Sequence, residues 1–237
     1  LLCLMMVGCK EEKKAPRIVR SKGLPSELLL VVDKAVWESE VADPLKQVLE
    51  GPVPCLPQLE KYFRVTRIFT PYYTQTYTTF HSKIFVSLNP DAAKPVLGIS
   101  YDVCAKPQVE VAVKAASLKD LAEFIARNGD YIRDVIADAQ LEMRIEQLKK
   151  KYSKKAYTEL QTLMGRTIFA PEEIRAAKRG ERFLWAGSNL NEKDLNVVAY
   201  TYPWNGVDVL QPLHFAAVRD SVMQANIPGG PEGSFMG

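Results

Sequence analysis

The run Ser117–Met164, SLKDLAEFIARNGDYIRDVIADAQLEMRIEQLKKKYSKKAYTELQTLM, separates two segments whose patterns are mostly those of β-strands. Ser117 and Asp120 have the spacing of a capping box, so we expect a helix to begin there. Apolar residues then recur every three or four positions with charged residues between them, as in a helix that buries one face. The sequence therefore predicts a long central helix that ends near Gly165, a residue suited to a left-handed C-cap.

This helix is too long to remain unbroken in a small domain. Without interruption it would extend about 70 Å. The two weakest points are Asn128-Gly129 and the lysine-rich segment Lys149–Lys155, because glycine destabilises a helix interior and clustered like charges repel. We expect at least one break.

Strand patterns precede and follow the helix. The continuous apolar run Leu28–Asp33 is typical of a strand buried on both faces. The whole order predicts an α+β fold, in which one or more antiparallel sheets pack against the long central helix and a second, smaller β-α segment follows. The remaining expected elements are strands at Phe63–Phe69, Ile84–Leu88, Val96–Cys104, Gln108–Ala115, Thr167–Ala170, Phe183–Ala186 and Leu195–Pro203, and a helix at Pro212–Ala225.

The first residues have the pattern of a bacterial lipobox. Leu1–Gly8, LLCLMMVG, is apolar and too short to span a bilayer. Cys9 follows a small residue and precedes a charged run, as does the cysteine that is acylated when a lipoprotein signal peptide is removed. An apolar terminus with a buried cysteine is the alternative. The lipobox interpretation predicts an outer membrane lipoprotein that faces the periplasm or the cell surface.

These patterns divide the chain into four parts. Residues 1–8 are expected to be a signal-peptide remnant, 9–23 a lipidated tether, 24–165 an α+β half that ends in the long helix, and 166–237 a second β-β-α half. The last residues are rich in glycine and proline, as in a connection to a further strand, and no initiator methionine precedes Leu1. We therefore expect the natural chain to continue beyond both ends.

The cysteines follow from the same interpretation. Cys3 would leave with the signal peptide and Cys9 would carry the lipid. Cys55 and Cys104 would then share an oxidising compartment. They form either a disulfide or two separate thiols, and the distance between their Cα atoms decides which.

The sequence assigns no catalytic residue, metal ligand or cofactor. His81 and His214 are the only histidines, and neither has the spacing of a zinc motif. A triad of Ser82, His81 and Asp102 is disfavoured, because adjacent residues of a strand point to opposite faces. Glu172-Glu173 after a proline is typical of a first helical turn rather than of catalytic paired carboxylates.

The charge pattern argues against nucleic acid as a partner. The net charge is only +3. The run Lys149–Lys155 is better explained as a solvated helix face than as a nucleic-acid groove.

Two stretches are candidates for binding. Pro71–Phe80, PYYTQTYTTF, combines aromatic and hydroxyl groups as surfaces that contact sugars or proteins do. We predict partner binding by Tyr72, Tyr73, Tyr77 and Phe80, with an edge hairpin rich in β-forming residues as the alternative. Arg219-Asp220-Ser221 is a second candidate, with ion pairing inside the domain as its alternative.

Several short motifs carry a family resemblance from about Ser21 onward. They are Leu56-Pro57-Gln58, Pro107-Gln108, Phe183-Leu184-Trp185, Tyr200-Thr201-Tyr202-Pro203, Arg219-Asp220-Ser221, Ile227-Pro228-Gly229 and Gly233-Ser234-Phe235-Met236. Together they resemble an uncharacterised lipoprotein family of the Bacteroidetes, classed as a domain of unknown function. The sequence departs from that pattern at His81-Ser82-Lys83, where Arg-Asn is expected, and at Cys104, near an expected Trp. The resemblance implies further strands after residue 237, and it assigns no activity from which a catalytic role could be transferred to any residue.

The function that fits these observations best is a non-enzymatic binding module of the cell envelope. The lipid on Cys9 would make the membrane one partner, and an envelope protein or glycan would be the other. The alternative is a hydrolase of an envelope polymer, with catalytic residues partly outside this sequence.

Overall fold

The computed structural model describes residues 19–54, 56, 58–188, 195–204, 206 and 211–235. The chain forms two compact units that divide between Arg144 and Ile145. This boundary lies within the long helix, earlier than the expected boundary at Gly165. The residues of the expected signal peptide and Cys9 lie outside the described residues.

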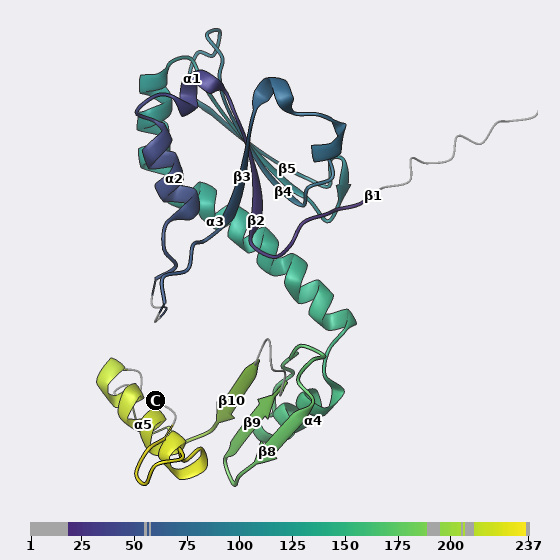
Figure 1. Ribbon diagram of the computed structural model, residues 1–237, viewed down its shortest axis with the longest axis vertical. Helices are drawn as coiled ribbons and strands as arrows, with labels where there is room; N and C mark the ends of the chain where they lie inside the picture. The colour runs from purple at the N-terminus through teal and green to yellow at the C-terminus, as the bar shows by residue number, and fades with distance from the viewer. Residues whose placement is uncertain are drawn as a thin grey trace, which may run out of the picture. The chain divides into compact units, whose positions relative to one another are not determined.

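The first unit contains a five-stranded sheet (Figure 1). The strand order is β3-β2-β4-β7-β5. Strands β3, β2, β4 and β7 run parallel to their neighbours, and β5 runs antiparallel to β7. The strands span Glu27–Val32 (β2), Arg64–Phe69 (β3), Ser82–Leu88 (β4), Val96–Tyr101 (β5) and Val109–Ala115 (β7).

The prediction that this sheet is antiparallel is wrong. The prediction rested on the run of strand patterns before the long helix, whereas residues 70–81 pass from β3 over β2 to β4, the central strand of the sheet. This crossover contains no α-helix and therefore lacks the usual pattern of a β-α-β unit. The continuous apolar run in β2 agrees with a parallel strand covered on both sides.

One face of the sheet carries the helices, as Figure 1 shows. These are α1 (Lys34–Trp37), α2 (Ala42–Glu50) and the first turns of α3 (Leu118–Lys150). Ser117 Oγ accepts a hydrogen bond from Asp120 N at 3.2 Å and donates one to the Asp120 carboxylate at 2.6 Å, which confirms the predicted cap. The core on this face includes Leu28, Leu30, Val32, Leu45, Leu49, Ile84, Val86, Val109, Val111, Val113, Leu121, Ile125, Ile132 and Ile136.

The crossover segment covers part of the other face. We call Thr70–Phe80 the aromatic segment; it contains two short 3₁₀-helices, η1 (Thr70–Tyr72) and η2 (Gln75–Tyr77). Alternation along the strands directs Leu29, Val31, Lys83 and Phe85 to this face. Leu29, Val31 and Lys83 are fully buried there.

The folded part of the chain begins before Leu24, the expected first residue after the tether. Strand β1 (Val19–Arg20) pairs in parallel with β6 (Ala105–Lys106). Lys22 N then donates to Thr79 O at 2.8 Å. Two residues are too short a strand to give a recognisable pattern in sequence.

The long helix breaks once among the described residues, in the lysine-rich segment. Helix α3 ends at Lys150 and α4 spans Lys154–Met164. Between them Tyr152 pairs with Pro171, and Ser153 Oγ caps α4 by accepting from Ala156 N at 3.2 Å. Helix α3 continues through Asn128-Gly129 without a break. Helix α4 is capped by Gly165 in the predicted left-handed conformation, with φ of 62°.

The second unit contains a three-stranded antiparallel sheet in the order β10-β9-β8. The strands span Ala176–Arg179 (β8), Phe183–Gly187 (β9) and Asn196–Tyr200 (β10), and α5 spans Pro212–Asn226. The core joins Ala156 and Leu160 of α4 to Leu184 and Ala186 of β9. Strand β8 was not predicted, and Thr167–Ala170 is not a strand. Ala170 O instead accepts from Ser153 N at 3.0 Å.

Taken together, these elements confirm the α+β class. The five-stranded sheet packs against α3, and a small sheet with helices follows. Within the described ranges we find no helix that is long and apolar enough to cross a membrane.

Candidate functional site

The most unusual side chain in the sheet is Lys83, a fully buried lysine in β4. Its register partner in β7 is Glu110. The lysine Nζ lies 2.6 Å from Glu110 Oε1, and the glutamate side chain is 18% exposed. That oxygen is buried and has no aligned hydrogen bond, so it interacts with the ammonium mainly through charge.

The hydrogen atoms of the Lys83 ammonium are directed to the aromatic segment. Nζ donates to Tyr73 Oη at 3.1 Å and to Thr78 O at 2.8 Å. It also lies 5.7 Å from the centroid of the Tyr73 ring. A charged lysine in a dry site needs such acceptors, since an unpaired buried charge is strongly unfavourable. Lys83 therefore holds the aromatic segment against the sheet.

Gln108 is a second buried anchor for the same segment. Its Nε2 donates to Thr78 O and to Phe80 O, both at 2.7 Å. Its Oε1 accepts from Cys104 N at 2.9 Å and from Ala105 N at 3.3 Å. Gln108 therefore joins the aromatic segment to the turn before β7 through all of its polar atoms.

The four predicted partner-binding residues do not share one environment. The Tyr73 ring lies edge-on to Phe85 at 5.2 Å and stacks with Tyr77 at 6.4 Å. Tyr77 in turn lies 6.3 Å from Phe80, so three of the four form a continuous aromatic row that is half-buried. Tyr72 differs, because it is 68% exposed. The alternative of an edge hairpin is wrong, because the segment forms two 3₁₀-helices over the sheet.

These contacts determine what the Lys83 site can do chemically. The Lys83 amine donates its hydrogen bonds to the protein acceptors Tyr73 Oη and Thr78 O, and the side chain has no exposed surface. A buried amine already held by Glu110 and Tyr73 is not free to attack a substrate. The arrangement instead fixes a surface segment, which is the role that we assign to it.

Ser82 and His81 are close together, contrary to our prediction that they point apart. His81 Nδ1 lies 2.7 Å from Ser82 Oγ. The alternation rule fails here because His81 lies in the bend just before β4 and not in the strand itself.

The rest of this pair is unlike a catalytic triad. His81 Nε2 lies 3.0 Å from Leu24 O, a carbonyl that can only accept, so this nitrogen donates; in the neutral ring Nδ1 then accepts from Ser82. Gln140 Nε2 also donates to Ser82 Oγ at 3.0 Å. Asp102 instead binds Gln108 N and Lys106. Ser82 is fully buried. Through these hydrogen bonds the pair joins β4 to α3 and to the N-terminal segment.

The carboxyl edge of the parallel strands, where open α/β sheets commonly bind ligands, is closed by Asp33. Asp33 Oδ2 accepts from Leu88 N at 2.9 Å, and Oδ1 accepts from Thr70 Oγ1 at 2.6 Å. One carboxylate thus connects the ends of β2 and β4 and the start of the aromatic segment. Both carboxylate oxygens of Asp33 therefore already accept hydrogen bonds from within the fold.

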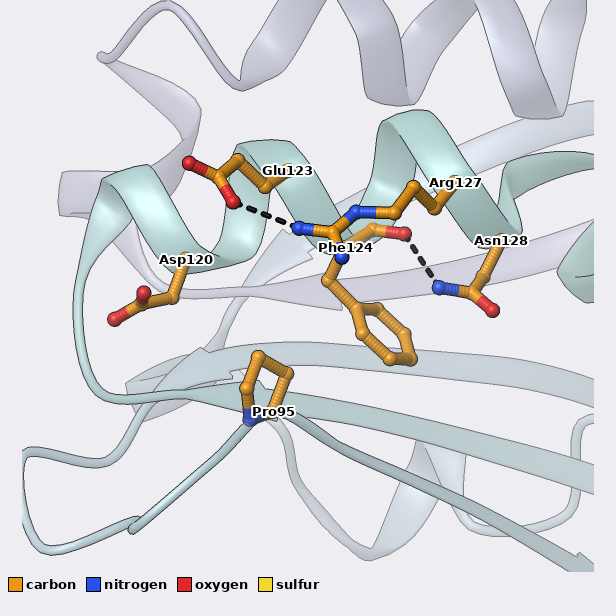
Figure 2. A pocket seen from close by; sticks show the side chains of 6 residues that line it. All are labelled: Pro95, Asp120, Glu123, Phe124, Arg127 and Asn128. Carbon is orange, nitrogen blue, oxygen red and sulfur yellow. Dashed lines mark hydrogen bonds and ion pairs between the residues drawn. The ribbon is translucent and has the colours of Figure 1, made fainter.

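A small pocket of about 170 Å³ lies between the loop before β5 and the first turns of α3 (Figure 2). Pro95 faces the Phe124 ring across it. The charged lining is already paired, with Arg127 bound to Glu123 at 2.7 Å and Asp120 bound to Ser117. Drug-sized ligands need roughly 300 Å³ or more. This pocket therefore supports no binding function for a large ligand.

The remaining predicted residues have structural contacts or lie outside the described ranges. Glu172 ion-pairs with Lys151 at 2.7 Å in a turn, and Arg219 pairs with its neighbour Asp220 at 2.6 Å, as the alternative for that motif predicted. Cys104 is an exposed free thiol, whereas Cys55 is not among the described residues. In those ranges, no three His, Cys, Asp or Glu side chains are grouped so that they could hold a metal ion.

Sequence reasoning missed the anchors of the aromatic segment. A signal for one of them was present, because Lys83 stands directly before the apolar run Ile84-Phe85-Val86 within the strand SKIFVSL. A lysine there requires a buried partner or an exposed face. Nothing in the sequence indicated that Glu110 and Tyr73 would be its partners.

Comparison with known proteins divides the chain at the break in the long helix. Residues 21–149 match the model of a domain of unknown function, DUF8532, and residues 153–237 match the model of a second, DUF4837. The break between α3 and α4 lies between the two matched segments. No curated protein and no solved structure matches the chain. Because the first model covers more than half of the residues, the chain belongs to the family described as the domain of unknown function DUF8532.

Proposed function

We propose that this chain is a non-enzymatic, lipid-anchored protein of the bacterial cell envelope that binds a partner through the aromatic segment. The observation that carries the proposal is the double anchoring of Thr70–Phe80 by Lys83 and Gln108, with Tyr72 left 68% exposed. A large aromatic side chain on a fixed backbone segment contributes to binding with little entropy loss on association. The partner would be an envelope protein or a glycan.

The aromatic row supports this interpretation. Tyr73, Tyr77 and Phe80 are each half-buried, so their rings stabilise the segment beneath Tyr72. Tyrosine is enriched in the energetically important centres of interfaces because it combines a large apolar ring with a hydroxyl group. The segment therefore presents one largely exposed ring, Tyr72, and three half-buried rings that pack within the segment and against the sheet.

A photo-crosslinking experiment tests the partner site. A photoreactive phenylalanine analogue replaces Tyr72 in the full-length protein in intact cells, and the matched control places it at Tyr131, which is 56% exposed on α3. We expect a discrete adduct from position 72 that is absent from position 131, and Tyr72→Ala should lower recovery of the same partner. Equal adducts at both positions would show that Tyr72 is not the contact.

The lipid anchor is a part of the proposal that rests on sequence alone. Met6-Val7-Gly8-Cys9 has the lipobox order, and the charged residues after Cys9 fit a tether. The same interpretation places the folded part at the outer membrane, facing the periplasm or the surface, in a lipoprotein of the Bacteroidetes type. Cys9→Ser should abolish labelling by radioactive palmitate and move the protein to the soluble fraction. Labelling that persists in the variant would contradict acylation at Cys9.

The contact between Ser82 and His81 is the specific observation that bears on the alternative, a hydrolase of an envelope polymer. The contact has the length of a nucleophile–base pair, but Ser82 is fully buried and also bound by Gln140. A fluorophosphonate probe therefore should not label Ser82 in the folded protein. Labelling that is lost in Ser82→Ala would favour the hydrolase.

A further inference from the structure

The outer edge of β5 is an unprotected sheet edge. β5 is the last strand in the order β3-β2-β4-β7-β5, and no other strand of the described ranges pairs with its outer side. An edge strand presents unpaired backbone N–H and C=O groups that another strand can use. The outer side of β5 can therefore accept a further strand unless its own residues prevent the pairing.

The backbone ladder shows which residues of β5 face outward. Asp102 N, just beyond the strand, donates to Gln108 O at 3.0 Å and so points toward β7. In an antiparallel pair, successive residues direct both backbone groups alternately inward and outward. Leu97, Ile99 and Tyr101 therefore present their N–H and C=O groups to the outside of the sheet.

The opposite edge of the same sheet is protected and β5 is not. Edge strands of soluble proteins commonly carry charged residues, proline or bulges that discourage pairing. β3, the other edge, contains Arg64 and Arg67 within RVTRIF. β5, with the sequence VLGISY, contains no charged residue and no proline in its six positions. Tyr101 at its end is 62% exposed.

We propose that β5 pairs with β5 of a second copy of this chain, antiparallel and about a twofold axis perpendicular to the sheet. Such an axis keeps the helix-covered face of both copies on the same side. Residues that face each other then belong to the same face, and the outward-facing residues pair with one another. Ile99 lies opposite Ile99 of the second copy, and Leu97 lies opposite Tyr101 of the second copy.

Three observations favour a second copy as the occupant. The paired side chains, Leu97 with Tyr101 and Ile99 with Ile99, are aliphatic or aromatic and uncharged, which is a favourable kind of cross-strand pair. The strand has no charge with which to repel itself. In the proposed register Asp102 of one copy, which also binds Lys106, lies opposite Val96 of the other, two residues from Lys94, so residues of opposite charge flank each end of the ladder.

The opposite face of β5 offers little obstruction. A Cβ atom on Gly98 would have only Ala112 Cβ, at 3.9 Å, within contact distance. In the proposed register Gly98 faces Ser100 of the second copy, so two small residues meet. A contact of one six-residue strand per copy is small for an interface, so we expect a concentration-dependent dimer rather than a permanent one.

Sedimentation velocity over a wide range of concentrations tests the proposal on the full chain. Tyr101→Lys places a charge opposite Leu97 of the second copy and, by symmetry, occurs twice in each dimer. We expect it to weaken dimerisation about tenfold or more. Tyr131→Lys is the matched control, since it makes the same change at an exposed site on α3 and should leave dimerisation unchanged.

A symmetric crosslink gives a second readout that does not depend on the stability of the charged variant. Hydrogen-bonded residues of antiparallel strands have Cα atoms about 5.5 Å apart, which is within the range of a disulfide. Mild oxidation of Ile99→Cys should therefore link two copies more efficiently than oxidation of the parent chain. A chain that stays monomeric at every concentration, or a dimer that is equally stable in Tyr101→Lys, would overturn the proposal.

Discussion

Lys83 and Glu110 stand directly opposite each other in the parallel pair of β4 and β7, and their charged atoms lie 2.6 Å apart. Both side chains are on the face that the aromatic segment covers, away from the helices. The two helix-side neighbours of Lys83 in β4, Ser82 and Ile84, are fully buried. One ion pair therefore permits a charged residue in the middle of the sheet and positions the segment above it.

Removal of the carboxylate charge should destabilise this unit markedly. Glu110→Gln leaves the Lys83 ammonium buried with no counter-charge, a change that costs about 3 kcal/mol when one partner of a buried pair is lost. Hydrogen exchange of the β4 and β7 amides measures the opening free energy of the first unit. The control is Glu123→Gln, which breaks an exposed ion pair with Arg127 and should cost less than about 1 kcal/mol.

The double variant Lys83→Met/Glu110→Gln distinguishes a buried charge from a local packing defect. If the unpaired ammonium causes the loss, removal of both charges should recover much of the stability. A Glu110→Gln variant that is no less stable than Glu123→Gln would show that the ion pair contributes little. In that case water would have to reach Lys83 in the native protein.

Gln108→Ala should loosen the aromatic segment and the turn before β7 together. The substitution leaves the carbonyls of Thr78 and Phe80 and the amides of Cys104 and Ala105 without their glutamine partner. Each unsatisfied buried group costs about 1–3 kcal/mol, although Thr78 O keeps its bond from Lys83. We expect faster hydrogen exchange in both segments and weaker partner recovery. Unchanged exchange at residues 70–80 would contradict the assignment of Gln108 as an anchor.

Gly129→Ala should destabilise the protein, although alanine is the better helix former. A Cβ atom at this position would clash with Val48 Cγ2 of α2, so the Val48 side chain or one of the two helices must move. Overpacking of this kind costs about 1–3 kcal/mol, which exceeds the gain of roughly 1 kcal/mol from helix propensity. Thermal unfolding should show the loss, and Val48→Ala in the same chain should reverse part of it. A stabilised Gly129→Ala would indicate that α2 and α3 have room between them.

The packing of Gly129 also explains why the long helix does not break at Asn128-Gly129, one of its two predicted weak points. Propensity identified Asn128-Gly129 and Lys149–Lys155 as weak points and gave no means of choosing between them. Gly129 is retained in the helix because α2 packs against it. The second point breaks because Ser153 restarts the helix with its own cap and Tyr152 pairs with Pro171. Neither feature could be predicted from propensity, because Pro171 is distant from Tyr152 in sequence and the Ser153 cap depends on backbone geometry.

The strand positions followed from sequence better than their pairing did. Leu28–Asp33 and Gln108–Ala115 agree with β2 and β7 within a residue at each end, because burial sets their apolar pattern. Pairing depends on the path of the chain between strands, and the aromatic segment crosses without a helix. The contacts of Lys83 could not be predicted from the sequence for the same reason, since Glu110 becomes its neighbour only through the parallel pairing of β4 with β7.

In the second unit, the ionisation of Tyr200 offers a test of the packing around β10. Burial raises the pKa of Tyr200, the neighbouring Tyr202 raises it further, and the positive charge of Arg219 lowers it. Tyr200 faces Phe183 in the register of β10 and β9, and its ring lies 6.2 Å from that of Tyr202. Its phenol therefore loses a proton less readily in the folded protein than in the unfolded chain.

The sign of the resulting pH dependence follows from this shift. An unfolded tyrosine ionises near pH 10, so the contribution of Tyr200 to stability is fully present below that pH and is lost as the pH rises through the folded value. Tyr200→Phe should therefore reduce the loss of stability of the second unit above about pH 10. Arg219→Gln should move the absorbance titration of Tyr200 to still higher pH, because the nearby cation is removed. Measurement of tyrosinate absorbance in both variants checks the assignment, and a titration that moves to lower pH in Arg219→Gln would show that α5 does not bring Arg219 near Tyr200.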